Sequence, residues 1–119
     1  MNRKRKSRPL SEKELRDMFL AFNRDFFNHK INVRGTIVQW GTLKRDDAYG
    51  TSSWKHVISI NKKLRNMPVF AAQTLLHEMA HMVLIQAGYI GYGCDGGHSI
   101  LFYAEIDRLY KIGAYEGLL

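Results

Sequence analysis

The feature that most constrains this chain is a long segment in its second half that is almost free of charge. Between Arg65 and Asp95, Glu78 is the only residue that carries a formal charge. Pro68 suits the first turn of a helix, and the residues that follow it are apolar on most sides of a helix. We therefore expect residues 68–87 to form a central buried helix. A lone carboxylate on such a helix is costly unless something compensates its charge.

Two further helices are indicated, one on each side of this segment. Ser11 and Glu14 form a capping-box pattern, and large apolar residues follow them at helical spacing, which predicts a helix over residues 11–28. A third helix is expected over residues 98–112, because apolar residues again recur along it and Gly113 provides a natural stop.

Three short runs between the first two helices have the composition of strands. They cover residues 36–40, 49–54 and 56–60. Alternation in the last run would place His56, Ile58 and Ile60 on one face. We interpret the three runs as a small meander, although the pattern does not define the order of the strands.

Together these elements predict an α+β fold with an N-terminal helix, a three-stranded sheet, a central helix and a C-terminal helix. A chain of 119 residues suits one compact domain. We expect this domain to cover residues 11–119, after a basic arm formed by residues 1–10. The polar residues of the central segment favour a core helix over a membrane span. A single cysteine, Cys94, and no apolar stretch after the basic N-terminus fit a cytoplasmic protein.

The central helix carries the pattern His77-Glu78-Met79-Ala80-His81. Residues four apart share a helix face, so the imidazoles of His77 and His81 can point at one ion, at about 2.0–2.1 Å from zinc. Glu78 is rotated about 100° from His77, where it can reach a water on the metal and take its proton. The pattern is short enough to occur by chance, but a divalent cation would compensate the buried Glu78. We predict one Zn²⁺ per chain, with Glu78 as the catalytic base.

A tetrahedral catalytic site needs a third protein ligand and one open position. The longer pattern HExxHxxGxxH is excluded, because Leu84 and Ala87 stand where it requires Gly and His. The candidates further along the chain are Cys94, Asp95, His98 and Glu105. We favour His98, since imidazole suits zinc and the glycine-rich loop before it can return the chain to the central helix. Glu105 is the rival ligand, or an acceptor for a hydrogen bond from a ligand histidine. His29 and His56 are expected to be ordinary surface or loop histidines.

Charge is distributed unevenly along the chain, whose net charge is +7. Residues 1–65 contain 16 Lys and Arg against 6 Asp and Glu, whereas residues 66–119 contain 2 against 5. Such an asymmetry suggests a polyanionic partner for the first half. Trp40, Tyr49 and Trp54 lie near basic clusters and could stack on unpaired bases. We therefore expect non-specific DNA binding through the basic N-terminal half.

Four segments resemble the SprT-like (Spartan-type) zinc metallopeptidases. They are Leu15–Phe19 with Phe22–Phe27, the pairs Trp40-Gly41 and Tyr49-Gly50, the run Thr74–His81, and Gly97-His98-Ser99 followed by Phe102. The last two segments, in this order, are the more specific. The resemblance covers residues 11–110. Many members of this family continue into a zinc ribbon or another DNA-binding tail, and the cysteines of such a ribbon are not present in this sequence.

The resemblance implies a zincin-like core and hydrolysis of peptide bonds in protein substrates, which in the best-known members are proteins attached to DNA. By motif match it implies that His77, His81 and His98 are zinc ligands and that Glu78 is the catalytic base. Two other functions remain open. One is a nucleic-acid-binding module with a structural zinc, which would have no need for Glu78, and the other is a peptidase dedicated to one regulatory partner.

Overall fold

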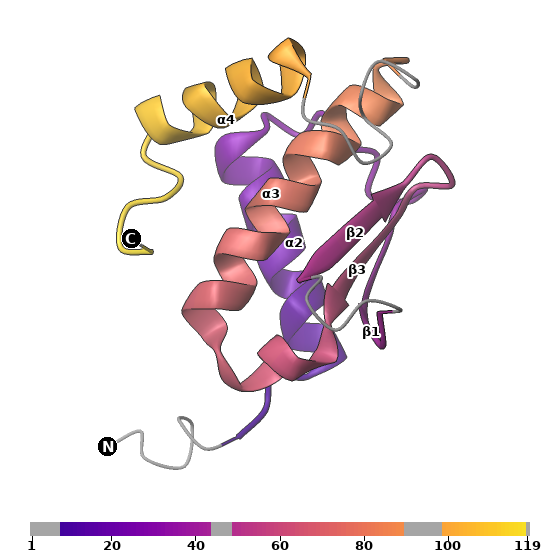
Figure 1. Cartoon of the computed structure of the whole chain (residues 1–119), viewed down its shortest axis with the longest axis vertical. Helices are drawn as coiled ribbons and strands as arrows, with labels where there is room; N and C mark the ends of the chain where they lie inside the picture. Colours follow the sequence, from indigo (N-terminus) through magenta and orange to yellow (C-terminus); the bar gives the residue numbers. More distant parts are fainter. Residues whose placement is uncertain (1–7, 44–48, 90–98, 119) are drawn as a thin grey trace.

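The structure is a computed structural model that describes residues 8–43, 49–89 and 99–118. Its elements, in chain order, are α2 (Glu12–Phe26), β1 (Ile37–Gly41), β2 (Gly50–Ser53), β3 (Val57–Asn61), η1 (Lys62–Asn66), α3 (Pro68–Gln86) and α4 (Ile100–Lys111). The expected α+β fold is confirmed, because the described residues form the α-helices α2, α3 and α4 and one small sheet (Figure 1). The division into an arm and a domain over residues 11–119 stays a prediction.

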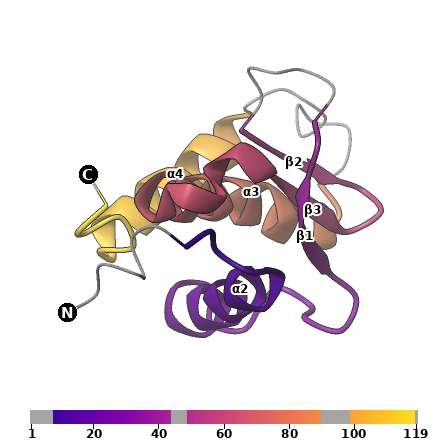
Figure 2. The same ribbon diagram turned by 90° about the horizontal axis from the view of Figure 1, so that it is seen from below.

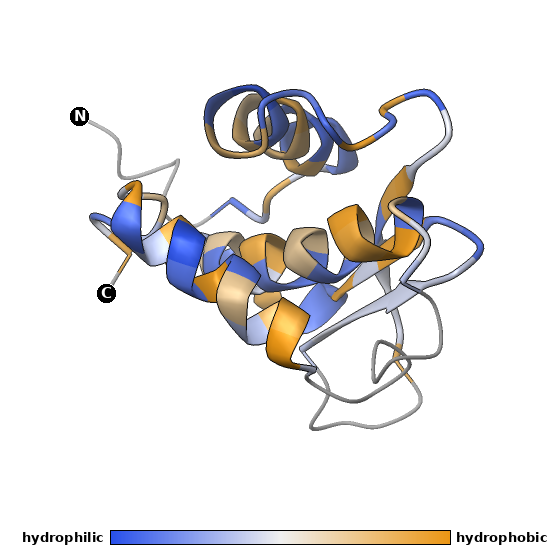
Figure 3. Ribbon diagram, turned by 90° about the horizontal axis from the view of Figure 1, so that it is seen from above, coloured by the Kyte–Doolittle hydropathy of each residue, from blue (hydrophilic) through white to orange (hydrophobic). Residues whose placement is uncertain are grey.

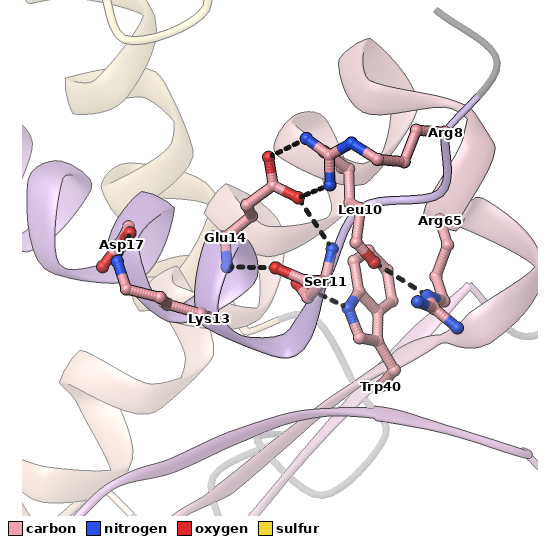
Figure 4. A network of polar contacts seen from close by, with 8 residues as sticks. All are labelled: Arg8, Leu10, Ser11, Lys13, Glu14, Asp17, Trp40 and Arg65. Atoms are coloured by element: carbon pink, nitrogen blue, oxygen red, sulfur yellow. Dashed lines mark hydrogen bonds and ion pairs between the residues drawn. The ribbon is translucent and has the colours of Figure 1, made fainter. Parts of the chain in front are cut away.

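Helix α2 begins with the capping box that the sequence predicts. The backbone N–H of Glu14 donates to Ser11 Oγ at 3.0 Å, and the backbone N–H of Ser11 donates to Glu14 Oε1 at 2.9 Å. Arg8 donates to both carboxylate oxygens of Glu14, at 2.9 and 3.1 Å. Figure 4 shows these bonds around the first turn of the helix. The start of α2 is therefore defined by residues close in sequence.

The same region is tied to distant parts of the chain. The indole N–H of Trp40, on β1, donates to the carbonyl of Ser11 at 3.1 Å. Leu10 and Arg65 exchange two bonds of 2.8 Å. One runs from the Leu10 backbone N–H to the Arg65 carbonyl, and the other, which Figure 4 shows, runs from Arg65 Nε to the Leu10 carbonyl. These bonds fasten the beginning of α2 to the sheet and to η1.

The sheet differs from the predicted meander. Its strand order is β1-β3-β2, with β3 parallel to β1 and antiparallel to β2. The meander was wrong because β3 takes the centre: Ile58 and Ile60 have no exposed surface, and a strand paired on both edges is the natural place for such a run. His56 also lies outside the strand. It occupies the turn between β2 and β3, with a φ of 65°.

Helix α3 is the central buried helix, as predicted. It packs against α2, α4, η1 and the strands β2 and β3. Figure 2 shows α2 and α4 at different sides of α3, and Figure 3 shows more hydrophobic residues along α3 than along α2. Within the described part of the chain, no helix is long and apolar enough to cross a membrane.

Helix α4 starts at Ile100, where Ser99 Oγ accepts a hydrogen bond of 3.2 Å from the backbone N–H of Phe102. The helix ends shortly before Gly113, whose φ of 85° suits the residue that follows a helix. After this glycine the chain turns back, so that Ala114 and Tyr115 are buried. The expected bounds of the third helix are thus close to those observed.

Candidate metal centre

Helix α3 places the two predicted histidine ligands one turn apart on one face. The ring centres of His77 and His81 are 5.1 Å apart, and the rings are inclined by 69°. Two imidazoles held at ~2.0–2.1 Å from one tetrahedral zinc have ring centres about 5 Å apart. The separation of these two rings therefore fits a shared metal ion.

The carboxylate of Glu78 lies beside this pair and is buried, with 6% of the residue exposed. Burial raises the pKa of Glu78 from 4.5 to about 7, and a hydrogen bond with Ser52 on β2 opposes this rise. Desolvation dominates because the charged form of a carboxyl group loses water without an equivalent replacement. Glu78 is therefore a carboxyl group that can both accept and release a proton near neutral pH.

Gly50 allows strand β2 to lie directly on the site. A Cβ atom at this position would come within 2.8 Å of Thr74 Cγ2 and 3.1 Å of Glu78 Cγ. The shorter of these contacts requires the Thr74 side chain, the strand or the helix to shift. The sequence indicated Gly50 only through the family resemblance, and it did not indicate Ser52. Neither residue lies in a sequence pattern from which its contact with the distant helix α3 could be predicted.

A cavity of about 300 Å³ opens at this position. It lies between the start of β2 and the first half of α3, and it is lined by Tyr49, Gly50, Gln73, Thr74, His77 and Glu78. Tyr49 is held at its rim by an edge-on contact with Phe70, with ring centres 4.8 Å apart. The cavity therefore exposes one predicted ligand and the predicted base to a small molecule or a segment of peptide.

Phe102 on α4 supports both histidines and was not recognised from the sequence as a site residue. Its ring stacks on His81 at 4.1 Å and 17°, and it meets His77 edge-on at 4.9 Å and 62°. Only 2% of Phe102 is exposed. These contacts fix the orientation of the two imidazoles.

The third ligand is not identified by the structure. His98, Cys94 and Asp95 lie outside the described residues, and the residues that are described contain no group of three potential ligands. Both carboxylate oxygens of Glu105 are engaged by Arg108, at 3.1 and 2.5 Å. This ion pair does not favour Glu105 as a ligand, and His98 stays a prediction.

His29 and His56 lie in turns, as expected for loop histidines. Their φ angles are 59° and 65°, and His29 is exposed. Neither belongs to α3 or α4.

A comparison with models of protein families matches residues 15–112 to the SprT-like family. The chain belongs to the SprT-like family. A search of curated proteins finds no match.

The SprT-like match spans the chain from within α2 to the residue after α4, so it includes every described residue of the candidate centre. Membership in this family is consistent with a metallopeptidase-like domain. The family is usually associated with zinc. The donor set fits that metal, because imidazole nitrogens are common zinc ligands and the buried carboxylate beside them is favoured by a nearby cation.

Proposed function

We propose that this protein is a zinc-dependent endopeptidase that hydrolyses peptide bonds of protein substrates. In this proposal His77, His81 and His98 bind one Zn²⁺ per chain, and Glu78 is the catalytic base. The observation that carries the proposal is the placement of a buried Glu78 beside two histidines on one face of α3, at a cavity that is open to a peptide.

When bound, zinc supplies Lewis acidity that polarises a carbonyl group and makes water more acidic. The remaining work belongs to the chain. Glu78 accepts a proton from the attacking water and delivers it to the departing nitrogen. Ser52 orients the Glu78 carboxylate, and the close approach of Gly50 keeps β2 against it. Phe102 holds the two imidazoles in place.

The alternative of a purely structural zinc receives less support from this arrangement. A structural site is closed by protein ligands and needs no base. Glu78, in contrast, lines a cavity rather than a packed interior. A peptidase dedicated to one regulatory partner would use the same residues, so it differs from the main proposal only in its substrate.

The test is cleavage of an unfolded protein substrate by zinc-loaded protein, compared between wild type and Glu78→Gln. The variant keeps the shape of the side chain but removes the base, so cleavage should fall by ~10²–10⁴-fold while zinc content and fold are retained. Glu12→Gln, at an exposed glutamate in the first turn of α2, is the matched control. An unchanged rate in Glu78→Gln would refute the assigned role.

We also propose that the basic N-terminal half binds DNA without sequence preference, so that DNA-associated proteins are among the substrates. Lys55 lies over the ring of Trp54 at 5.7 Å, in the turn between β2 and β3, and 64% of Trp54 is exposed. Tyr49 is also exposed, whereas Trp40 packs against the core and its indole N–H is bonded to Ser11. Of the three aromatic residues that the sequence places near basic clusters, Trp54 and Tyr49 are therefore available for stacking, and Trp40 is not.

Binding of this kind depends on phosphates and weakens steeply with salt. The test is DNA affinity across a salt series, for the whole chain and for a chain shortened by residues 1–9. Removal of the five basic residues in that arm should flatten the salt dependence. A salt dependence that the shortening leaves unchanged, or no binding at low salt, would contradict the proposal.

A further inference from the structure

A second cavity, of about 400 Å³, lies on the other side of His77, between α3 and α4. It shares Gln73 and His77 with the first cavity. The two cavities therefore flank the same predicted ligand, and a peptide that passes His77 would contact both. The proposed peptidase mechanism leaves the second cavity without a role.

The inner wall of this cavity is fixed by buried aromatic side chains. Phe102 and Tyr115 are 2% and 6% exposed. Tyr115 comes from the segment that turns back after Gly113, and its ring stacks on Tyr110 at 4.5 Å and 25°. The side-chain amide of Gln73 donates to the carbonyl of Leu118, which holds this segment against α3.

The outer wall is more accessible. Tyr103 and Tyr110 are 59% and 49% exposed, and Ile106 lies half-buried between them on α4. A rigid base with an accessible rim is the form expected of a pocket that receives a side chain from outside. A volume near the lower end of the usual range of about 300–1,000 Å³ suits one large side chain rather than a whole ligand of drug size.

The residues that line the cavity determine which kind of side chain it can bind. The described residues that line it are aromatic or aliphatic apart from Gln73 and His77, and none of these described residues is Asp, Glu, Lys or Arg. A charged side chain would lose its hydration there without gaining an opposite charge. An aromatic or large aliphatic side chain would instead gain from burial and from ring contacts.

We infer that this cavity is a specificity pocket for an aromatic or large aliphatic side chain of the protein substrate, at a position next to the bond that is cut. The inference rests on the proposed peptidase function. It assigns selection of the cleavage site to α4 and the C-terminal segment, and it leaves the chemistry to α3 and β2.

The first experiment measures kcat/KM for peptides that differ only at the residues flanking the cut bond, with Phe, Leu, Ala, Lys or Glu in turn. At one of these positions Phe or Leu should be favoured over the other residues by about tenfold or more, as is usual for apolar pockets. Ile106→Trp fills the cavity and should reduce the preference for Phe by about tenfold, with the Ala peptide little affected. Ile112→Trp is the matched control, because Ile112 is 48% exposed and does not line this cavity.

Tyr103→Asp provides a second variant that is tolerated by the fold, since Tyr103 is mostly exposed. A carboxylate at the rim should lower the rate for the Phe peptide and raise the rate for the Lys peptide. A wild-type preference for Lys would instead indicate that the rings act as an aromatic cage for cations and would overturn the inference. Equal rates for all peptides, or a preference that Ile106→Trp leaves unchanged, would overturn it as well.

The second experiment separates this inference from the proposed activity. N-acetylphenylalanine amide is titrated into metal-free protein, and chemical shifts of the Ile106 methyl groups and the Tyr110 ring are followed by NMR, with N-acetylglycine amide as control. Saturable shifts with the phenylalanine probe alone would support the pocket even if zinc-loaded protein cleaves nothing. Cleavage of peptides without any such shift would leave the activity standing and overturn the pocket.

Discussion

Helices α2 and α3 are the two longest described helices, and their polar residues are placed in opposite ways. In α2 no charged residue is buried, and exposed charged residues form ion pairs, Lys13 with Asp17 and Arg24 with Asp25. Its buried polar residue, Asn23, exchanges two bonds with the backbone of Ile31, at 3.0 and 3.2 Å. The polar side chains of α2 are thus either exposed to solvent or hydrogen-bonded to another group.

Helix α3 buries its acidic residue instead. It has no side-chain cap at Met67 and no charged residue in its first or last turn. Its buried polar residues include Glu78 and His81. The raised pKa of Glu78 indicates that its hydrogen bond with Ser52 does not offset the loss of water. The comparison teaches that α2 is organised for stability, whereas α3 accepts a cost in stability that a metal centre would explain.

The largest expected effect is on zinc affinity, and it concerns the third ligand, which must come from outside α3. His98→Ala should weaken zinc binding by more than ~100-fold, since loss of a ligand exceeds the 10–100-fold typical of residues that only support ligands. Glu105→Gln should weaken it little, because Glu105 is paired with Arg108. Zinc affinity measured by competition with a chelator decides between them. If Glu105→Gln removes the metal and His98→Ala does not, the assignment of His98 is wrong.

A second prediction concerns the cost of burying Glu78 in metal-free protein. The pKa of Glu78 is raised to about 7 in the folded protein. The contribution of Glu78 to the unfolding free energy is therefore most favourable below pH 4.5, and it is lost as the pH rises through 7. The full loss of unfolding free energy is about 3 kcal/mol, because the pKa of Glu78 rises by roughly two to three on folding and each pKa unit corresponds to about 1.36 kcal/mol. Glu78→Gln has no such titration, so it should gain stability relative to wild type between pH 5 and pH 8.

Urea unfolding of both proteins at each pH in the presence of a chelator measures this difference. Groups that the two proteins share contribute equally and cancel. A difference in unfolding free energy that stays constant from pH 5 to pH 8 would show that burial of Glu78 carries no cost, and the contrast between α2 and α3 would fail.

A third and smaller effect compares two buried phenylalanines. Phe102→Leu and Phe19→Leu should each lower the unfolding free energy by ~1–2 kcal/mol, because both rings are almost fully buried. Only Phe102→Leu should also weaken zinc binding, since Phe102 contacts both histidines and Phe19 belongs to α2. Equal zinc affinities in the two variants would show that Phe102 merely fills space.

The parts of this molecule that could be predicted from its sequence are those with local causes. Ser11, Pro68 and Gly113 mark helix ends through bonds or backbone angles within a few residues. The shared face of His77 and His81 follows from helix geometry alone.

The rest depends on contacts between residues that are distant in sequence. The pairing of β1 with β3 joins residues about twenty positions apart, and a strand pattern does not name its partner. Gly50 and Ser52 reach Glu78 from another element, as Phe102 reaches the histidines. None of these contacts has a local pattern, so the supporting residues of the site emerge only from the fold.

The most direct test of the central claim is the zinc content of purified protein, measured by elemental analysis in wild type and in a His77→Ala/His81→Ala double variant. The same double substitution at His29 and His56, which lie in turns, is the control. We predict about one zinc per chain in wild type and in the control, as expected for a mononuclear site, and no bound zinc in the His77/His81 variant. Full zinc occupancy in that variant would contradict the central claim, because His77 and His81 would then not be the residues that bind zinc.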